Sequence, residues 1–247
     1  RGHRAGVPAL GQPVGPHAGA RSFGCAPLPP TVDGDMLLIS EIYKSICGES
    51  QFSGRPCTLV RLTGCHVRCG WCDSAHAFNG GEPLAVDAVL ARVRELGPRT
   101  VLVTGGEPLL QPAVVDLLQA LLADGREVLL ETSGTIDPRT LVPLAAVPVG
   151  VHRIVDLKAP GSGLEPGVID WDGIACLGAG DELKAVLADR RDYEWARGLV
   201  REAGRLPAGV PVSFSPVQDG LSAADLAQWI LEDGLEVRFQ LQLHKTI

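Results

Sequence analysis

The sequence lacks an excess of basic residues and any long apolar run. Its 247 residues include 22 Lys and Arg against 29 Asp and Glu, a formal charge of −7 that argues against a general nucleic-acid binder. No stretch approaches the roughly 18 uninterrupted apolar residues that a membrane span requires. An apolar fraction of 45% is ample for the core of one sizeable domain. We therefore expect neither a membrane nor a nucleic acid as partner.

An even set of paired cysteines is also missing. There are seven cysteines, of which three lie in one short stretch and the others are scattered: Cys25, Cys47, Cys57 and Cys176. This is not the pattern of a secreted disulfide framework. Free thiols of this kind suit a reducing compartment, so we expect a cytoplasmic protein.

Methionine is almost absent, and Met36 is the only one. Residues 1–35 before it contain seven glycines and six prolines and no periodic apolar pattern. Such a segment buries too little to fold, so we expect a disordered leader, either a dispensable extension or a start-site artefact. The working protein is then a single domain over residues 36–247.

Three cysteines, Cys65, Cys69 and Cys72, are spaced so that their sulfurs can turn toward one centre. Thiolate is the ligand of iron–sulfur clusters, which usually take four protein ligands, so three leave one iron open to a substrate. The alternative is a structural zinc site with His66 or His76 as the fourth ligand.

Apolar strands alternate with amphipathic helices after Met36, which predicts a βα architecture with a parallel sheet. Strands are expected at 57–62, 101–104, 128–130, 154–157, 183–187, 210–214 and 237–243, and helices at 86–93, 114–122 and after Ser222. Polar residues follow successive strands: Glu107, Glu131 and Lys158. In parallel βα folds these strand ends converge on one rim, which is the active face.

The C-x3-C-x2-C spacing, followed by Gly105-Gly106-Glu107-Pro108 at a strand end, resembles the radical S-adenosylmethionine superfamily. The resemblance implies an α/β fold, a partial (β/α)6 TIM-like barrel with a modified core. It also implies a 4Fe-4S cluster on the three cysteines, whose open iron binds S-adenosylmethionine and generates a 5'-deoxyadenosyl radical.

Six further blocks narrow the resemblance to the 7-carboxy-7-deazaguanine synthase family. They run in the family's order and include Ile39–Glu49, Arg61–Cys65, Trp71–Ser74, Glu131–Gly134, Asp156–Lys158 and Gln240–Lys245. Members of this family are lyases that convert 6-carboxy-5,6,7,8-tetrahydropterin to 7-carboxy-7-deazaguanine with loss of ammonia, on the way to deazapurines such as queuosine. The resemblance also implies a bound Mg²⁺ ion, a homodimer, and a flavodoxin or ferredoxin as electron donor.

The resemblance assigns residues to the pterin. Arg61 offers a rigid fork of donors that matches the substrate carboxylate, and Glu49 can accept from the amino and ring N–H groups. Gly48 would let the ring approach the main chain. The remaining substrate contacts are expected at Ile46, Cys47, Thr104 and His244, and Ser74 supplies a hard oxygen for Mg²⁺.

On the cofactor side, Gly105 and Gly106 would remove side chains where S-adenosylmethionine lies against the backbone, and Glu107 could accept from its amino group. Ser133 and Lys158 are expected near its carboxylate and ribose. Trp71, Cys72 and Asp73 should flank the adenosyl part. Ser215 and Gln218 are expected adenine contacts.

Two departures from the family stand out. Cys47 replaces a common glutamine, and the chain ends earlier than many relatives, which leaves Ile247 without an assigned role. Two other function classes stay open at this point. One is another radical S-adenosylmethionine enzyme, such as an activase of glycyl radical enzymes, and the other is a non-enzymatic iron–sulfur or zinc module.

Overall fold

The computed structural model describes residues 34, 36–135, 142–164 and 168–245. A nine-stranded sheet forms its centre, in the order β3-β1-β2-β4-β5-β6-β7-β8-β9. The strands are β1 (Met36–Ile46), β2 (Pro56–Leu62), β3 (Glu82–Ala85), β4 (Thr100–Gly105), β5 (Glu127–Thr132), β6 (His152–Asp156), β7 (Glu182–Leu187), β8 (Val212–Pro216) and β9 (Arg238–Phe239). The predicted leader, apart from Gly34, lies outside the described residues, as do Cys25 and Ile247.

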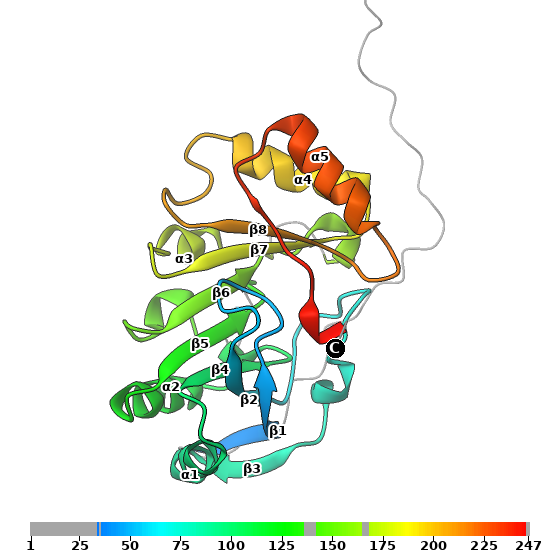
Figure 1. The fold of residues 1–247 in the computed structure, drawn as a ribbon. Helices are drawn as coiled ribbons and strands as arrows, with labels where there is room; N and C mark the ends of the chain where they lie inside the picture. The colour runs from blue at the N-terminus through cyan, green and yellow to red at the C-terminus, as the bar shows by residue number, and fades with distance from the viewer. Residues whose placement is uncertain (1–33, 35, 136–141, 165–167, 246–247) are drawn as a thin grey trace, which may run out of the picture.

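Strand direction divides the sheet into two parts. From β2 through β9 all neighbouring strands are parallel, whereas β1 is antiparallel to β2 and β3 is antiparallel to β1. The sheet curves and stays open, with β3 and β9 at its edges (Figure 1). A parallel sheet brings the carboxyl ends of its strands to one side, where loops can build a site.

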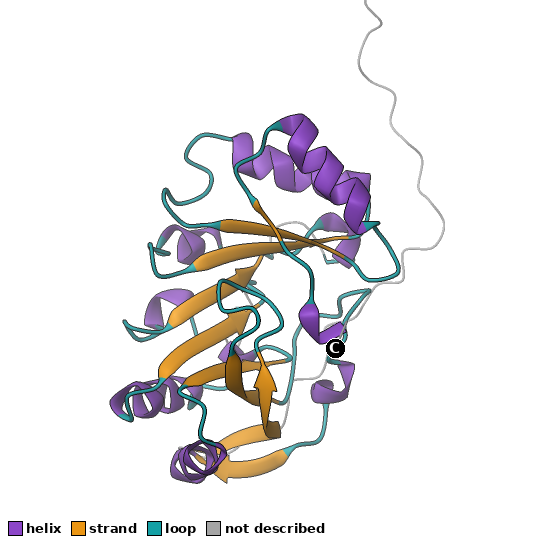
Figure 2. Ribbon diagram, in the orientation of Figure 1, coloured by secondary structure: helices purple, strands orange, loops and turns teal. Residues whose placement is uncertain are grey.

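Helices follow most of the parallel strands and cover the outside of the curve (Figure 2). They are α1 (Val86–Leu96), α2 (Val114–Ala123), α3 (Trp171–Ala175), α4 (Arg190–Arg201) and α5 (Ala223–Asp233). Short 3-10 helices are η1 (Ala75–Phe78), η2 (Pro108–Leu110), η3 (Leu144–Ala146), η4 (Pro160–Ser162) and η5 (Leu243–Lys245). No helix in the described part of the chain is long and apolar enough to cross a membrane.

The apolar periodicity places the three predicted helices, α1, α2 and α5, correctly, whereas α3 and α4 were not predicted. In α1 the predicted stripe of Val86, Val89, Leu90 and Val93 is buried, and the helix ends before Gly97, whose φ of 97° favours glycine. Helix α5 begins after Ser222, which accepts a hydrogen bond from the Asp225 backbone as the sequence predicts. Long-range packing then joins these helices to the sheet in the larger of two hydrophobic clusters.

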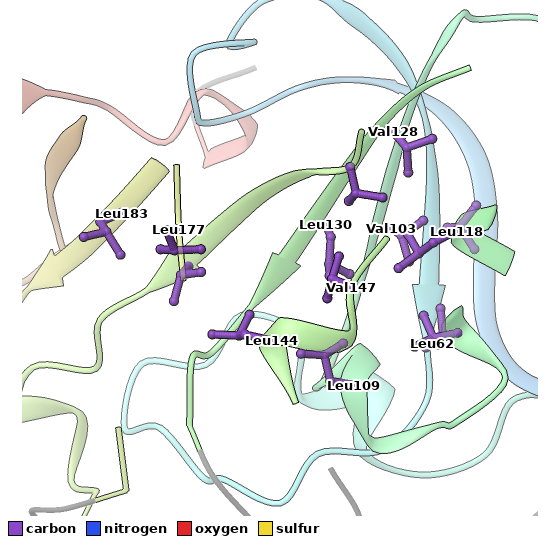
Figure 3. Packing of buried hydrophobic residues seen from close by; sticks show 14 of the residues in the cluster. Leu62, Val103, Leu109, Leu118, Val128, Leu130, Leu144, Val147, Leu177 and Leu183 are labelled. Carbon is purple, nitrogen blue, oxygen red and sulfur yellow. The ribbon is translucent and has the colours of Figure 1, made fainter. Parts of the chain in front are cut away.

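That core lies between the outer face of the sheet and the helices. Figure 3 shows part of it, where Leu62 of β2 and Val103 of β4 lie near Leu118 of α2. Alternate residues of these strands point the other way, into the hollow of the sheet. The core therefore fixes which side chains line that hollow.

The structure agrees with the predicted partial (β/α)6 barrel and shows where its core is modified. Six parallel strands from β2 to β8 each lead into a crossover, but the described residues between β5 and β6 carry only η3. The antiparallel pair β1 and β3 extends the sheet beyond β2, and β3 was not predicted.

The predicted strand at 237–243 is wrong in length, because β9 covers only Arg238–Phe239. After β9 the segment 240–245 leaves the sheet and crosses toward the loop that follows β1 (Figure 1). The Gln240 side chain accepts from the Ser50 backbone N–H at 3.0 Å and donates to its carbonyl at 2.8 Å. Leu243 N–H also donates to the Gly48 carbonyl at 2.9 Å, so hydrogen bonds to this loop replace a strand ladder.

Candidate active site

A cavity of about 570 Å³ lies in the hollow of the sheet. Its walls come from β1, β2, β4, β5, β6 and β7, from the cysteine loop after β2, and from segment 240–245. Most of the residues predicted for the site line it: Ile46, Gly48, Glu49, Arg61, Cys65, Cys69, Trp71, Cys72, Asp73, Ser74, Thr104, Gly105, Gly106, Ser133, Lys158 and His244. The fold thus gathers around one space residues that are far apart in the chain.

The cysteine loop is held at both ends by backbone hydrogen bonds. Gly64 N–H donates to Ala77 at 2.8 Å, and Gly70 N–H donates to Ser162 of η4 at 3.0 Å. Within the loop, Arg68 donates to the Cys65 carbonyl at 2.8 Å and lies over the ring of Phe78. These contacts present the three thiols to the cavity from a fixed main chain.

The donor set of the loop fits a cluster better than a single zinc ion. Burial raises the pKa of Cys65 to about 12 and also raises that of Cys69, and a bound cluster or zinc ion would equally favour their thiolate forms. No three His, Cys, Asp or Glu side chains among the described residues are grouped to hold one metal ion. Cluster ligands bind different irons and need not converge on one point.

Both histidines considered for zinc have polar neighbours other than the thiols. His66 Nε2 lies 2.7 Å from the Thr135 hydroxyl, and His76 Nε2 lies 3.4 Å from Glu41. A tetrahedral zinc site needs a fourth ligand at about 2.0–2.3 Å. The arrangement therefore favours the three-thiol cluster site over the zinc alternative.

Gly105 and Gly106 line the cavity, but the structure gives another reason for glycine there. A Cβ on Gly105 would lie 2.6 Å from the Leu62 carbonyl oxygen, and one on Gly106 would collide with the Gly64 carbonyl and Cys65. Glu107 N–H also donates to the Gly64 carbonyl at 2.8 Å. Both glycines thus let the end of β4 pack directly against the cysteine loop.

Glu107 is buried and does not line the cavity. Its carboxylate accepts four hydrogen bonds, from the backbone of Leu109, the hydroxyl of Thr132, and both the backbone and hydroxyl of Ser133. A carboxylate has about four acceptor positions, and all are taken. Glu107 therefore fixes the position of Ser133, whose backbone and hydroxyl both donate to it. Its predicted contact with the cofactor amino group stays a prediction.

Lys158 lines the cavity with its ammonium group 2.8 Å from Asp156 Oδ2. Burial alone would lower the pKa of Lys158, but the Asp156 carboxylate and the nearby Cys69 raise it above its ordinary value. The group stays a cation, the charge needed opposite a bound carboxylate.

Glu49 is buried on the cavity wall beside Lys184 of β7, whose ammonium nitrogen lies 2.6 Å from Glu49 Oε2. Burial would raise the pKa of Glu49, yet the Lys184 charge and hydrogen bond lower it, so the carboxylate is ionised. Gln242 Nε2 donates to the other oxygen, Oε1. Each Glu49 oxygen keeps a lone pair for a ligand donor.

Lys184 is the centre of a larger charge cluster. It also lies 3.4 Å from Glu131 Oε1 and 4.0 Å from Asp156 Oδ2. Burial lowers its pKa, but the three carboxylates raise it well above the ordinary value. Thr104 donates to Glu131 at 3.3 Å, which ties the predicted substrate contact on β4 to this cluster.

Arg61 of β2 is held on both sides. Its Nε donates to Glu41 of β1 at 2.6 Å, and its Nη1 donates to the Ser74 hydroxyl at 3.1 Å. Ser74 in turn donates to Asp73 at 2.9 Å. A hydrogen bond with His244 lowers the pKa of Asp73 below its usual range, so its carboxylate is ionised. The Arg61 guanidinium, the Ser74 hydroxyl and the Asp73 carboxylate together form one polar wall.

His244 from the closing segment packs against the loop after β1. A Cβ on Gly48 would collide with the His244 ring, so this glycine makes room for the imidazole. His244 Nε2 lies 3.4 Å from Asp73 and 4.0 Å from Glu49. The histidine therefore joins the cysteine loop to the Glu49 side of the cavity.

Three further predicted residues do not line the cavity. Cys47 is buried against Cys57. Its N–H donates to the Arg55 carbonyl, and its own carbonyl accepts from the Gly54 N–H. Gln218 is exposed beyond β8. Ser215 is buried, and its hydroxyl has no hydrogen-bond partner in the part of the chain that is described. Their predicted contacts stay predictions, and the structure offers them no place on the cavity wall.

Several cavity residues were not assigned from the sequence: Glu41, Asp156, Lys184 and Gln242. Glu131 lines the cavity as its strand-end position predicts. The sequence contained a signal for Lys184, because this residue interrupts an apolar run. In the structure every residue of β7 is buried. Lysine is almost never fully buried unless it is paired, so such a residue indicates a buried ion pair. Gln242 had no comparable signal, since an alternating segment reads equally as a surface strand.

Comparison with known proteins agrees with this geometry. A model of the radical SAM superfamily matches residues 59–154. The 7-carboxy-7-deazaguanine synthase of Koribacter versatilis is 44% identical over 223 residues, which cover 85% of this chain and 96% of the relative. That of Chlorobaculum tepidum is 41% identical over 213 residues, covering 85% and 94%. The crystal structure of QueE from Escherichia coli shares the fold, with a TM-score of 0.65 at 22% identity over 85% of this chain and 95% of that chain.

Proposed function

The chain belongs to the 7-carboxy-7-deazaguanine synthase family of radical S-adenosylmethionine enzymes, and on that premise we propose its reaction. It converts 6-carboxy-5,6,7,8-tetrahydropterin to 7-carboxy-7-deazaguanine with loss of ammonia, a lyase step of deazapurine biosynthesis of the queuosine type. One observation carries the proposal: a single cavity is lined by three thiols, a buried ionised Glu49 and Arg61.

The superfamily implies a 4Fe-4S cluster and S-adenosylmethionine. Cys65, Cys69 and Cys72 would hold the cluster, and when both groups are bound they supply a 5'-deoxyadenosyl radical. Ser133 and Lys158 would bind the polar groups of S-adenosylmethionine. Support comes from their position, since Glu107 orients Ser133 and Asp156 keeps Lys158 charged.

The substrate would lie between Glu49 and Arg61. Glu49 accepts hydrogen bonds from the amino and ring N–H groups of the pterin, and Lys184 keeps it ionised for that purpose. Arg61 binds the substrate carboxylate, with its guanidinium plane held by Glu41. Thr104 and His244 complete the wall on either side.

Mg²⁺ would bind at Ser74 beside Asp73, where hydroxyl and carboxylate oxygens are the hard ligands that this ion prefers. Arg61 Nη1 donates to the Ser74 hydroxyl at 3.1 Å, so metal and guanidinium compete for one oxygen. Mg²⁺ binding would therefore free part of Arg61 for the substrate carboxylate.

The working form would be a cytoplasmic homodimer that receives electrons from a flavodoxin or ferredoxin. The family resemblance supports the dimer and the electron donor. Six free cysteines among the described residues support a reducing compartment.

The test is anaerobic reconstitution of the full chain with iron and sulfide, followed by incubation with the carboxylated pterin, S-adenosylmethionine, Mg²⁺ and a strong reductant. We expect 7-carboxy-7-deazaguanine and ammonia as products. Cys69→Ala should lose visible absorption and turnover together, while Cys176→Ala, at an exposed thiol, should lose neither. Cleavage of S-adenosylmethionine without the deazaguanine product would refute the reaction, and an active Cys69→Ala would refute the cluster ligands.

A further inference from the structure

The loop after β1 bends at Ser50, directly beside Glu49. Ser50 has a φ of 75°, and it is a buried residue that carries a side chain. A residue with a Cβ rarely adopts this left-handed conformation, and it stays there only where surrounding contacts hold the backbone. Because φ at Ser50 sets the direction of the chain on either side, these contacts also set the position of Glu49.

Buried side chains hold the backbone on both sides of this bend. Gln240 accepts from the Ser50 N–H at 3.0 Å and donates to the Ser50 carbonyl at 2.8 Å. Glu182, the first residue of β7, accepts from the next N–H, that of Gln51, with both carboxyl oxygens at 3.1 Å. Glu182 is only 2% exposed, so little water can take its place as the acceptor.

Glu182 is itself fixed, and it shares its strand with the partner of Glu49. His152 Nε2, at the start of β6, lies 3.0 Å from Glu182 Oε1, and the ring of Phe52 packs edge-on against His152. Glu182 and Lys184 are two residues apart on β7, so their side chains leave the strand on the same face. The strand therefore contacts the loop twice, through Glu182 at a backbone N–H and through Lys184 at the carboxylate of Glu49.

We propose that Glu182 is a positioning residue for the substrate site: by holding the backbone after Ser50, it keeps that residue left-handed and keeps Glu49 on the cavity wall. This inference rests on the proposed function, in which Glu49 binds the pterin. Glu182 does not line the cavity, so its effect on the substrate passes through the loop. Without its carboxyl group, Ser50 can relax to a negative φ, which moves Glu49 away from Lys184.

The test compares Glu182→Met with wild type, using the full chain reconstituted anaerobically with its cluster and S-adenosylmethionine. Methionine keeps the length of the side chain and removes both acceptor oxygens. Calorimetric titration with the carboxylated pterin measures affinity, and cleavage of S-adenosylmethionine by a strong reductant is measured in the same preparation. We expect pterin binding to weaken about tenfold, because a backbone N–H loses its acceptor. Cleavage should be unchanged, because the thiols lie on a different loop.

Ser50→Gly provides the measurement that separates positioning from a general loss of stability. Glycine adopts a positive φ without steric cost, so the bend no longer needs the contact with Glu182. Ser50→Gly alone should leave pterin affinity unchanged. Combined with Glu182→Met, it should recover most of the tenfold loss, so that the two changes are coupled in a double-mutant cycle instead of additive.

The matched control is Asp181→Asn, at the buried carboxylate next to Glu182. Its backbone partners are Arg153 and Gly178 instead of the loop. This variant should lower the free energy of unfolding in urea and leave pterin affinity unchanged. If Glu182→Met does not fold, Glu182→Gln, which keeps one acceptor oxygen, replaces it, with an expected loss of about threefold that Ser50→Gly removes.

Three results would overturn the proposal. Unchanged pterin affinity in Glu182→Met would show that the loop keeps its position without this contact. An equal loss of pterin binding and of S-adenosylmethionine cleavage would show a merely structural role. A loss of affinity that Ser50→Gly does not reduce would show that Glu182 does not act through the bend.

The same measurements separate this inference from the proposed reaction. Wild type that binds the pterin, loses affinity in Glu182→Met and regains it with Ser50→Gly, yet makes no deazaguanine, would leave the positioning role standing and refute the reaction. Normal turnover by wild type with unchanged affinity in Glu182→Met would refute the positioning role alone. Absence of any pterin binding by wild type would refute both.

Discussion

The ammonium nitrogen of Lys184 lies 2.6 Å from Oε2 of Glu49, and both side chains are buried. One comes from β7 and the other from the loop after β1, so the pair joins two distant parts of the chain across the cavity. A buried ion pair of this kind gives little net stability, but removing one partner leaves an uncompensated charge. Its value here is to keep a carboxylate ionised where a ligand must find an acceptor.

We expect Lys184→Met to destabilise the protein by about 3–5 kcal/mol and to weaken pterin binding, because Glu49 would remain buried without a counter-charge. Urea unfolding and calorimetric titration measure the two effects. Lys44→Met, at an exposed lysine of β1, is the matched control and should change both by little. A variant as stable as wild type with full pterin affinity would show that the pair has no such role.

The same pair predicts a pH dependence. The pKa of Glu49 is lowered in the fold, so its contribution is present above the ordinary pKa of about 4.3 and is lost as the pH falls through the folded value. The pKa of Lys184 is raised, so its contribution is present below the ordinary pKa of about 10.4 and is lost as the pH rises through the folded value. The contribution of the pair should therefore be constant between about pH 5 and pH 10.

In Lys184→Met burial should instead raise the pKa of Glu49, and the carboxyl group would take up a proton on folding near neutral pH. The stability difference between wild type and variant should then be largest near pH 7 and shrink toward about pH 4.5. Free energies of unfolding measured in urea across this range provide the check. A difference that stays the same at every pH would contradict the assignment of the effect to Glu49.

Gly106→Ala should push the cysteine loop away from β4, because its Cβ would collide with the Gly64 carbonyl and Cys65. We expect a loss of about 1–3 kcal/mol in stability and a lower iron content after reconstitution. Gly198→Ala in α4, where a Cβ meets nothing within 4 Å, is the control and should be stabilising by about 0.5–1 kcal/mol. Normal iron loading in Gly106→Ala would show that the loop can shift without cost to the thiols.

Arg61→Lys should weaken binding of the carboxylated pterin on the order of 100-fold, since an ammonium group cannot replace a bidentate guanidinium fork. Cleavage of S-adenosylmethionine by the reduced enzyme should change little, because Arg61 is assigned to the substrate. The matched control is Arg92→Lys, at an exposed ion pair with Glu82. Unchanged pterin affinity in Arg61→Lys would place the substrate carboxylate elsewhere.

Much of the fold follows from local pattern. The apolar stripe of α1 and the cap at Ser222 gave correct helices, and the buried strands β4 and β5 were read from short apolar runs. The end of the chain could not be read in this way. Residues 237–243 alternate as a strand does, yet hydrogen bonds from Gln240 to Ser50 draw the segment over the cavity.

The residues of the site could likewise be predicted from the sequence only in part. The cysteine spacing and the family blocks located most cavity residues and the chemistry of their donors, and the relatives decide for the synthase over an activase or a zinc module. Gly105 and Gly106 were identified as site residues from the sequence. The physical reason that glycine is needed there, close contact with Leu62, Gly64 and Cys65, is visible only in the structure. Partners from different strand ends, such as Glu107 with Ser133, are not visible in either stretch by itself.

The sequence by itself determined the thiol trio, three of the helices and most of the parallel strands, because each depends on spacing between near neighbours in the chain. Its blocks along the core also indicated the family. Tertiary structure alone decided that Lys184 faces Glu49 and that Gln242 donates to the other oxygen of that carboxylate. Those relations depend on which strand ends and loops meet across the sheet. Burial then fixes their charges and hydrogen bonds, because water is no longer there to satisfy them.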